Sequence, residues 1–295
     1  MHPNLNTAAS IIEPLHLPIF AEKQLQVFIK RDDLIHPFIS GNKWRKLKYV
    51  LRDAKAKQKT ALATFGGAFS NHLLAVASAG ATFGFKTTGF VRGEELEIKN
   101  PVLKMCHLFG MRLVFISRHD YREKTFYYQK YFANDESVYY VPEGGSCLHA
   151  IPGVAEIASE LIEHYDHIFT ATGTGGTLAG LAQGVFERQL KTQVHGVAVI
   201  KGGDYLHQEI KQWIGEVPYN LHVDFHRGGY AKTDNELVNF ARSFIRNTGI
   251  VIEPIYTAKM LMALTQLASS DFFKPHEKIL CMHTGGVWGG HGLLF

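Results

Sequence analysis

Short runs of apolar residues recur along most of the chain and alternate with segments whose apolar residues share one helical face. Runs of this length, bounded by Gly, Pro, Asn and Asp, are typical of β-strands that are buried on both faces. The pattern predicts eight strands, at residues 25–29, 61–65, 87–91, 112–116, 138–141, 167–171, 194–200 and 278–282.

Helical spacing is clearest after residue 43, where five apolar residues fall on one face: Trp44, Leu47, Val50, Leu51 and Ala54. A second face, formed by Ile157, Leu161 and Ile162, follows Pro152-Gly153. Strands that alternate with helices indicate parallel sheets covered on both sides. The many strands and the clustered glycines favour two sheets over one. We therefore predict an α/β protein with two open, twisted, mostly parallel sheets flanked by helices.

The composition is that of an ordinary globular protein, with 46% hydrophobic and 20% charged residues in a chain of 295. This excludes disordered, collagen-like and coiled-coil classes. The longest segment without a formal charge, residues 60–85, is about as long as a membrane helix. Its centre contains Gly66-Gly67 and Ser70-Asn71-His72, which would be costly to bury in lipid. We expect no membrane span.

Charge and cysteine usage point to a cytoplasmic protein with a small-molecule partner. The net charge of +4 is small, and no block of Lys and Arg predicts a nucleic-acid partner. The three cysteines, Cys106, Cys147 and Cys281, are odd in number and far apart, as expected of reduced thiols. The first residues lack the pattern of a secretory signal. His222 and His226 have no third metal ligand nearby, so we interpret them as surface residues and predict no metal.

The glycine-rich segment Thr172-Gly173-Thr174-Gly175-Gly176-Thr177 follows a predicted strand and precedes a helix that we expect to begin near Leu178. Glycines let the backbone approach an anion, and the exposed N–H groups of a helix start favour negative charge. A dinucleotide fingerprint would require glycine at 178 and an acidic residue after the next strand, where Lys201 stands. No Gly-Lys-Ser/Thr follows either. The segment is a plain strand-to-helix turn or, as we favour, a monophosphate site.

Two other segments have ambiguous chemistry when taken alone. Ser70-Asn71-His72 follows a strand and a Gly66-Gly67 turn, so Ser70 or Asn71 could simply cap the next helix. The same geometry would present N–H groups to a carboxylate. Lys43, at the start of another helix, is either a surface charge or, inside a crevice, a nucleophile or base with a lowered pKa.

Seven motifs in order span almost the whole chain and together resemble the pyridoxal-phosphate enzymes of the tryptophan-synthase-β fold. The resemblance is strongest to the branch that contains 1-aminocyclopropane-1-carboxylate deaminase and D-cysteine desulfhydrase. It implies a large cofactor-binding domain of residues 1–48 and 149–295 and a small domain of residues 49–148. The motifs are Lys30-Arg31-Asp32-Asp33-Leu34, Gly41-Asn42-Lys43-Trp44-Arg45-Lys46-Leu47, Ser70-Asn71-His72, Pro142-Glu143-Gly144-Gly145-Ser146, Gly173-Thr174-Gly175-Gly176-Thr177, Glu253-Pro254-Ile255-Tyr256 and His283-Thr284-Gly285-Gly286.

The resemblance implies a binding role for several residues toward pyridoxal 5'-phosphate. Lys43 would carry the cofactor covalently, and Lys46 would point toward its phosphate. Asn71 would hydrogen-bond the ring hydroxyl, and Thr284 would meet the pyridine nitrogen. The main phosphate cradle would be Gly173, Thr174, Gly175, Gly176 and Thr177.

Roles toward a small amino-acid substrate follow in the same way. Ser70 would face the reacting carbon, and the amides of Ser70, Asn71 and His72 would hold the substrate carboxylate. Lys43, once displaced by the substrate, would take the α-proton. Tyr256 would exchange a proton with the leaving group, and Tyr230 would stand beside it over the substrate's side chain. The resemblance also suggests a homodimer.

One position bears on which member of the branch this is. The deaminases carry Glu directly after the tyrosine that matches Tyr256, where it keeps the pyridine nitrogen protonated, and this chain has Thr257. Neutral hydroxyls from Thr257 or Thr284 suit β-elimination better than opening of a cyclopropane ring. We therefore expect a D-cysteine desulfhydrase, with 1-aminocyclopropane-1-carboxylate deaminase as the alternative. A binder of the cofactor or another phosphate ligand without catalysis is a third possibility, which would not need Lys43.

Overall fold

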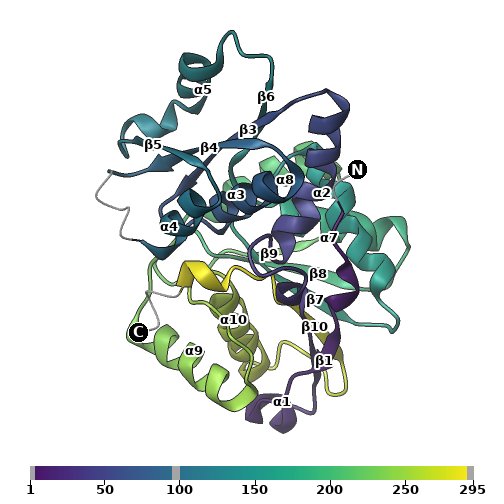
Figure 1. Cartoon of the computed structure of the whole chain (residues 1–295). Helices are drawn as coiled ribbons and strands as arrows, with labels where there is room; N and C mark the ends of the chain where they lie inside the picture. Colours follow the sequence, from purple (N-terminus) through teal and green to yellow (C-terminus); the bar gives the residue numbers. More distant parts are fainter. Residues whose placement is uncertain (1–3, 95–99, 291–295) are drawn as a thin grey trace.

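The computed structural model describes residues 4–94 and 100–290, and its strands form two separate sheets (Figure 1). The larger sheet has the order β1-β2-β10-β7-β8-β9, and the smaller has the order β5-β4-β3-β6. All pairs are parallel except β1 with β2. The predicted fold class is therefore confirmed. The strands are β1 Ile12–Pro14, β2 Gln26–Lys30, β3 Ala61–Gly67, β4 Lys86–Arg92, β5 Arg112–Ile116, β6 Val138–Val141, β7 His167–Thr172, β8 Gln193–Ala198, β9 Asn220–His222 and β10 Lys278–Met282.

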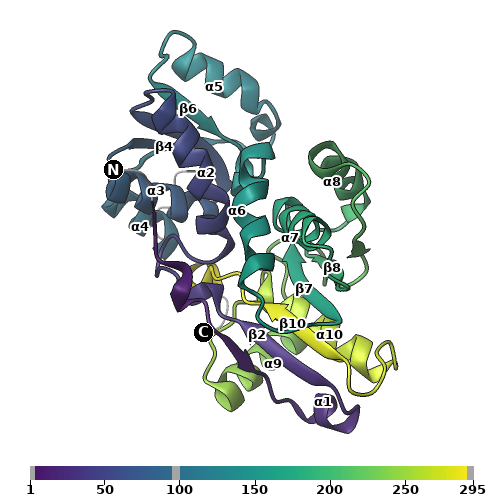
Figure 2. The ribbon, with the colours of Figure 1, turned by 90° about the vertical axis from the view of Figure 1, so that its right-hand side faces the viewer.

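Helices cover both faces of each sheet. In the larger sheet, α9 and α10 pack on one face, and α6, α7 and α8 pack on the other (Figure 2). In the smaller sheet, α2, α3 and α4 cover one face and α5 covers the other. The helices are α1 Pro18–Glu22, α2 Asn42–Ala56, α3 Asn71–Phe83, α4 Pro101–Leu108, α5 Lys124–Phe132, α6 Ile151–Ala155, α7 Gly176–Glu187, α8 Leu206–Ile214, α9 Asn235–Thr248 and α10 Thr257–Ser269.

The alternation of side chains along the strands explains the double covering. In β7, Ile168 packs with the core under α7, whereas the next residue, Phe169, packs with the core under α10. Leu280 in β10 joins the first of these cores, and Ile279 and Cys281 join the second. Because both faces need apolar residues, these strands appear in the sequence as mainly apolar runs and do not alternate regularly between polar and apolar residues.

The eight predicted strands are all present, each within about two residues of its expected ends. The helix predicted after Pro152 is shorter than expected, because α6 gives way to a 3₁₀ segment, Glu156–Glu160. Ile157 is buried there, but Ile162 lies beyond the helical segment and is 90% exposed. The prediction that Ile162 belongs to the buried face is therefore wrong.

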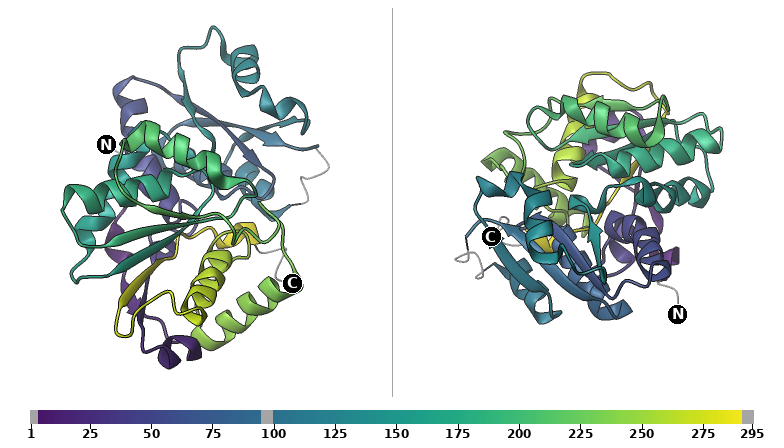
Figure 3. Two further views of the ribbon diagram at one scale, coloured as in Figure 1. Left: turned by 180° about the vertical axis from the view of Figure 1, so that it is seen from behind. Right: turned by 90° about the horizontal axis from the view of Figure 1, so that it is seen from above.

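The two sheets draw on different parts of the chain. Residues 12–30 and 167–282 supply the strands of the larger sheet, and residues 61–141 supply those of the smaller, so the sheets lie in opposite halves of the molecule (Figures 1 and 3). Helix α2 runs through the predicted boundary between residues 48 and 49, and the exact domain limits stay a prediction. Within the described ranges, no helix is long and apolar enough to cross a membrane.

A row of three histidines crosses β7, β8 and β9. His167 Nδ1 lies 3.0 Å from His195 Nε2, and His195 Nδ1 lies 3.0 Å from His222 Nε2. Glu277 ends the row, 3.1 Å from His167 Nε2. His222 is thus half-buried and hydrogen-bonded, so its interpretation as a surface residue is wrong. Among residues 4–94 and 100–290, no cluster of three or more potential ligands could hold a metal ion.

We expect acid to destabilise the protein through His195. Burial, with His167 and His222 beside it, lowers the pKa of His195 from 6.5 to about 3. The unfolded chain therefore binds more protons below pH 6.5, and stability falls as the pH drops toward 3. When the pH is lowered from 7.5 to 5, the shifted pKa of this residue should reduce the free energy of unfolding by about 2 kcal/mol.

Urea unfolding at the two pH values tests this expectation with a pair of variants. His195→Gln should lose about 2 kcal/mol less between pH 7.5 and 5 than the wild type. His119→Gln, in which a side chain that is 96% exposed is replaced, should behave as the wild type does. An equal pH-dependent loss in His195→Gln would show that another group causes the acid sensitivity.

Candidate active site

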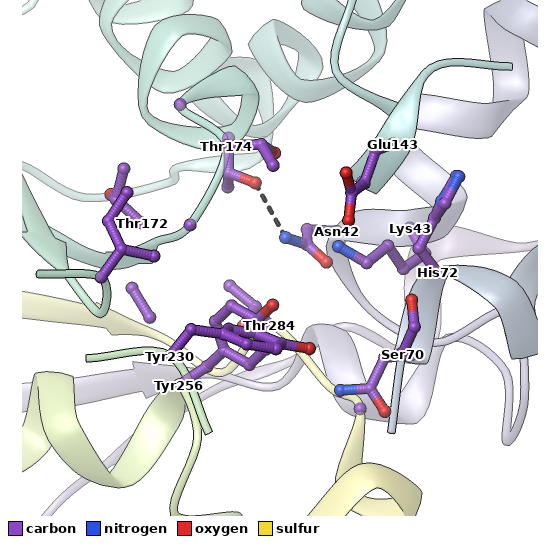
Figure 4. A pocket seen from close by; sticks show the side chains of 18 of the residues that line it. Asn42, Lys43, Ser70, His72, Glu143, Thr172, Thr174, Tyr230, Tyr256 and Thr284 are labelled. Carbon is purple, nitrogen blue, oxygen red and sulfur yellow. Dashed lines mark hydrogen bonds between the residues drawn. The ribbon is translucent and has the colours of Figure 1, made fainter. Parts of the chain in front are cut away.

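The carboxyl ends of strands from both sheets open onto one cavity of about 260 Å³. Gly67 and Arg92, the last residues of β3 and β4, line it from the smaller sheet, and Thr172, the last of β7, lines it from the larger. Figure 4 shows side chains from both sides converging on this space. The cavity collects nearly all the predicted site residues: Lys43, Lys46, Ser70, Asn71, His72, Gly173, Thr174, Gly175, Thr177, Tyr230, Tyr256 and Thr284.

The start of α2 places Lys43 in the cavity. Gly41 precedes the helix with φ +59°, and a Cβ at this position would lie 1.9 Å from the carbonyl oxygen of Thr284, so only glycine fits. The backbone N–H of Asn42 donates to the Thr284 carbonyl over 3.2 Å. Its side-chain Nδ2 donates to Thr177 Oγ1 over 2.8 Å (Figure 4). The first turn of α2 is therefore held between the loop after β10 and the turn after β7.

A buried ion cluster behind the cavity fixes the same turn of α2. Arg45 binds Asp32 through two bonds, Nε to Oδ2 at 3.0 Å and Nη2 to Oδ1 at 2.8 Å. It also pairs with Glu160, whose carboxylate lies 2.8 Å from Lys30 Nζ. Lys30 in turn donates to the carbonyl of Ser10 over 2.9 Å. Arg45, Asp32 and Lys30 are each at most 1% exposed, whereas the side chain of Glu160 is 25% exposed, so the cluster reaches water only through Glu160.

Lys46, one helical turn after Lys43, points at the glycine-rich turn. Its Nζ lies 3.0 Å from Ser146 Oγ, and a Cβ on Gly176 would lie 3.3 Å from the same nitrogen. Ser146 Oγ and Thr174 Oγ1 are 2.6 Å apart. Gly176 does not itself line the cavity, but it begins α7, and Gly175 before it has φ +78°. Backbone amides, hydroxyls and an ammonium group thus surround one point at a helix start.

This arrangement fits the phosphate of pyridoxal phosphate. Lys46 is 2% exposed and forms no ion pair within the described ranges. Burial and the nearby charge of Lys43 hold its pKa well below the usual value. An unpaired buried cation is costly unless an anion accompanies it. A phosphate at the start of α7 would supply that anion, and the chemistry of the donors present matches it.

The start of α3 forms the opposite wall. Ser70 is the N-cap of this helix and accepts from the backbone N–H of Leu73 over 3.3 Å, as expected of a cap. Ser70, Asn71 and His72 all line the cavity, so the cap and the predicted carboxylate site coincide. His72 Nε2 pairs with Thr64 Oγ1 at 2.8 Å, and burial next to Lys43 and Lys46 holds its pKa well below the usual value. A helix start beside a neutral imidazole suits a carboxylate.

Tyr230 and Tyr256 stand together on the side of the larger sheet, with ring centroids 6.0 Å apart (Figure 4). Fully buried Glu253 places Tyr256, because its carboxylate accepts from the backbone N–H groups of residues 255, 256 and 257 at 2.7–3.1 Å. Buried Lys259 places Tyr230, because its Nζ donates to the carbonyls of His226 and Gly229 at 2.9 and 2.7 Å. Both tyrosines are thus positioned by buried ionisable side chains, Glu253 and Lys259, that do not line the cavity.

The pKa shifts of Lys43, Tyr256 and Glu253 indicate which of them can accept or donate a proton near neutral pH. Burial lowers the pKa of Lys43 to about 8, so near neutral pH its amine can accept and return a proton. Burial and the adjacent Tyr230 raise the pKa of Tyr256 well above its usual value. Tyr256 therefore keeps its proton and acts as a donor rather than a base. Glu253, buried, has a pKa raised to about 7.

The sequence motifs left several residues of the cavity without a role. Asn42 and Glu143 line it and lie inside quoted motifs, which assigned them nothing. Arg92 and Tyr205 also line it, and no motif contains them. Arg92 could have been found from its position, because it ends a strand of a parallel sheet, where ligands bind. Thr257 shows the converse: it is fully buried but does not line the cavity, so only Thr284 presents the predicted hydroxyl there.

Comparison with known proteins agrees with this chemistry. A family model described as pyridoxal-phosphate dependent enzyme matches residues 12–285. A putative 1-aminocyclopropane-1-carboxylate deaminase of Thermotoga maritima is 34% identical over 283 residues, which cover 89% of each chain. A mitochondrial bifunctional D-cysteine desulfhydrase/1-aminocyclopropane-1-carboxylate deaminase of Arabidopsis thaliana is 27% identical, over 90% of this chain and 73% of its own. The crystal structure of a homologue of the deaminase, 30% identical, superposes with a TM-score of 0.84 over 97% of this chain and 93% of its own.

Proposed function

We propose that this chain, which belongs to the pyridoxal-phosphate-dependent enzyme family, is a lyase that acts on D-cysteine. The reaction converts D-cysteine and water into pyruvate, ammonia and hydrogen sulfide. Membership of the family makes the chain a pyridoxal-phosphate enzyme that acts on small amino acids. That the amino acid is D-cysteine is our proposal. The name of the Arabidopsis relative pairs D-cysteine with 1-aminocyclopropane-1-carboxylate, and these are the two substrates to be distinguished.

The residues of the cavity can perform the proton transfers that this reaction needs. When bound, the cofactor supplies a ring that withdraws electrons from the substrate's α-carbon. Lys43 takes the α-proton with its amine, and the start of α3 holds the carboxylate so that the α-carbon faces Lys43. Tyr256, whose pKa stays high, donates a proton to the departing sulfur. Lys46 and the turn 173–177 would hold the phosphate, and Asn71 and Thr284 would contact the ring.

The observation that carries the choice of substrate is the polar lining near Thr284. Among the described residues that line the cavity, only Glu143 bears a carboxylate, and it belongs to the loop after β6 in the smaller sheet. Thr284, on the larger sheet, offers a hydroxyl, which does not stabilise a proton on the pyridine nitrogen as a carboxylate does. A less electron-withdrawing ring suffices to expel a thiol but disfavours opening of a cyclopropane ring.

Assays of keto-acid release from both substrates test the proposal. D-cysteine should yield pyruvate with kcat/KM at least about ten times that for formation of 2-oxobutanoate from 1-aminocyclopropane-1-carboxylate, about 1.4 kcal/mol in activation free energy. L-cysteine serves as the stereochemical control and should react more slowly than its enantiomer. Faster formation of 2-oxobutanoate would instead make the chain a deaminase. The homodimer, the cytoplasmic location and the absence of nucleic-acid partners stay predictions.

A further inference from the structure

One cation at the cavity has no acidic partner within the described part of the chain. Arg92 ends β4, lines the cavity and is exposed. Its backbone pairs with the neighbouring strands, but no hydrogen bond or ion pair joins its guanidinium to another described residue. Its guanidinium lies 5.6 Å from the ring centroid of Tyr121 and 6.0 Å from that of Tyr230. Its Nη2 lies 3.7 Å from the position that a Cβ on Gly67 would take.

Glu143, the acidic residue among the described residues that line the cavity, already binds two other side chains. Tyr121 donates to its Oε1 over 3.0 Å, and Lys124 Nζ lies 2.5 Å from its Oε2. Both oxygens of Glu143 are thus satisfied from the side of α5. Within the described ranges the guanidinium of Arg92 therefore forms no ion pair, and two aromatic rings lie beside the planar group.

Arg92 differs from the two anion sites already described in the side chains that it contacts. The phosphate cradle lies at the start of α7, and the carboxylate site lies at the start of α3. Arg92 instead contacts Tyr230, the residue that we place over the substrate's side chain. An anion bound by Arg92 would therefore belong to the far end of the substrate.

We propose that Arg92 binds a negatively charged substituent on the β-carbon of the amino acid, so that the enzyme favours substrates with an anionic leaving group. The inference deepens the proposed β-elimination and depends on it. A guanidinium offers a planar pair of donors that matches phosphate, sulfonate or carboxylate oxygens, and it also stabilises a departing thiolate. A cyclopropane substrate has no such group and gains nothing from Arg92.

O-phospho-D-serine is the substrate in which this role is easiest to isolate. Removal of the α-proton breaks the bond between the β-carbon and the ester oxygen, and the oxygen leaves with the electron pair as phosphate. Water then completes the reaction, and the products are pyruvate, ammonia and phosphate. O-acetyl-D-serine gives the same pyruvate and ammonia but carries an uncharged substituent, so the two substrates differ chiefly in the charge that Arg92 would meet.

The test is the ratio of kcat/KM for O-phospho-D-serine to that for O-acetyl-D-serine, measured by pyruvate release. Arg92→Gln should lower this ratio by about 10- to 100-fold, as expected from loss of a charge-assisted pair of hydrogen bonds. Arg92→Lys, which keeps the charge without the planar fork, should give an intermediate ratio. Arg118→Gln removes an exposed cation of the same half of the molecule outside the cavity and should leave the ratio unchanged.

Two further readings make the outcome decisive. In the wild type, the ratio should fall as salt is added, because the guanidinium is exposed and screened. The visible absorbance of the bound cofactor confirms that each variant is folded and loaded. An unchanged ratio in loaded Arg92→Gln overturns this inference alone. Failure of the wild type to release a keto acid from any of these amino acids or from D-cysteine overturns the proposed function itself.

Discussion

Replacing Lys43 by alanine will abolish keto-acid release and the covalent attachment of the cofactor. In the proposed mechanism the amine of this residue both binds the cofactor and moves the α-proton, and loss of the proton transfer alone costs roughly 10²–10⁴ in rate. Reduction of the wild type with borohydride, followed by peptide mass spectrometry, should locate the cofactor on residue 43. The same procedure should find no labelled lysine in Lys43→Ala.

A matched variant separates this effect from damage to the helix. Lys55→Ala removes an exposed lysine from the last turn of α2 and should keep full labelling and activity. With the cofactor removed from both proteins, Lys43→Ala should unfold in urea close to the wild-type midpoint, because the lost side chain faces a cavity. Labelling of another lysine with activity retained would show that residue 43 is not the attachment site.

Arg45→Met will strongly destabilise the protein. It removes the partner of Asp32, a carboxylate that is fully buried, and leaves Glu160 with Lys30 alone. Breaking one partner of a buried ion pair costs about 3–5 kcal/mol, because the remaining charge keeps its desolvation penalty. Equilibrium unfolding in urea measures the loss directly, as a fall in midpoint at constant slope.

Lys48→Met is the control for that measurement. Lys48 lies on the same helix and pairs with Glu156, but both side chains are partly exposed, at 15% and 31%. Its removal should cost no more than about 1 kcal/mol. A similar small loss for Arg45→Met would mean that water or a rearranged partner compensates Asp32, and the cluster would then have little influence on α2.

The strands were predictable because buried parallel strands leave a strong, local signal. The central strands are mainly apolar and short, and Gly, Pro, Asn or Asp lies near their ends. The edge strands β1 and β9 were missed, since each is three residues long and mixed in polarity. Ile162 was placed wrongly because helical spacing continues in the sequence after the helix itself has ended.

The site was predictable where a motif combined glycine with a reactive group. Lys43, Ser70 and the turn 173–177 were found in this way, and the cavity brings them together. Arg92 and Lys259 could not be given a role, because each acts through a residue far away in the sequence. Glu253 lies inside a motif and acts on the next few residues, but the sequence alone did not show that its carboxylate binds their N–H groups. Arg92 meets Tyr230, and Lys259 binds the loop that carries Tyr230, and such pairings exist only after the chain has folded.

Helix α2 links the two halves of the molecule and so determines the width of the cavity. Its first turn is anchored to the larger sheet's half through Arg45, and its apolar face, from Trp44 to Ala54, is packed into the core of the smaller sheet. Because α2 contacts both halves of the molecule, it holds the two walls of the cavity at a fixed distance from each other. Folding therefore positions both walls of the cavity, and we expect α2 to move little when the cofactor binds.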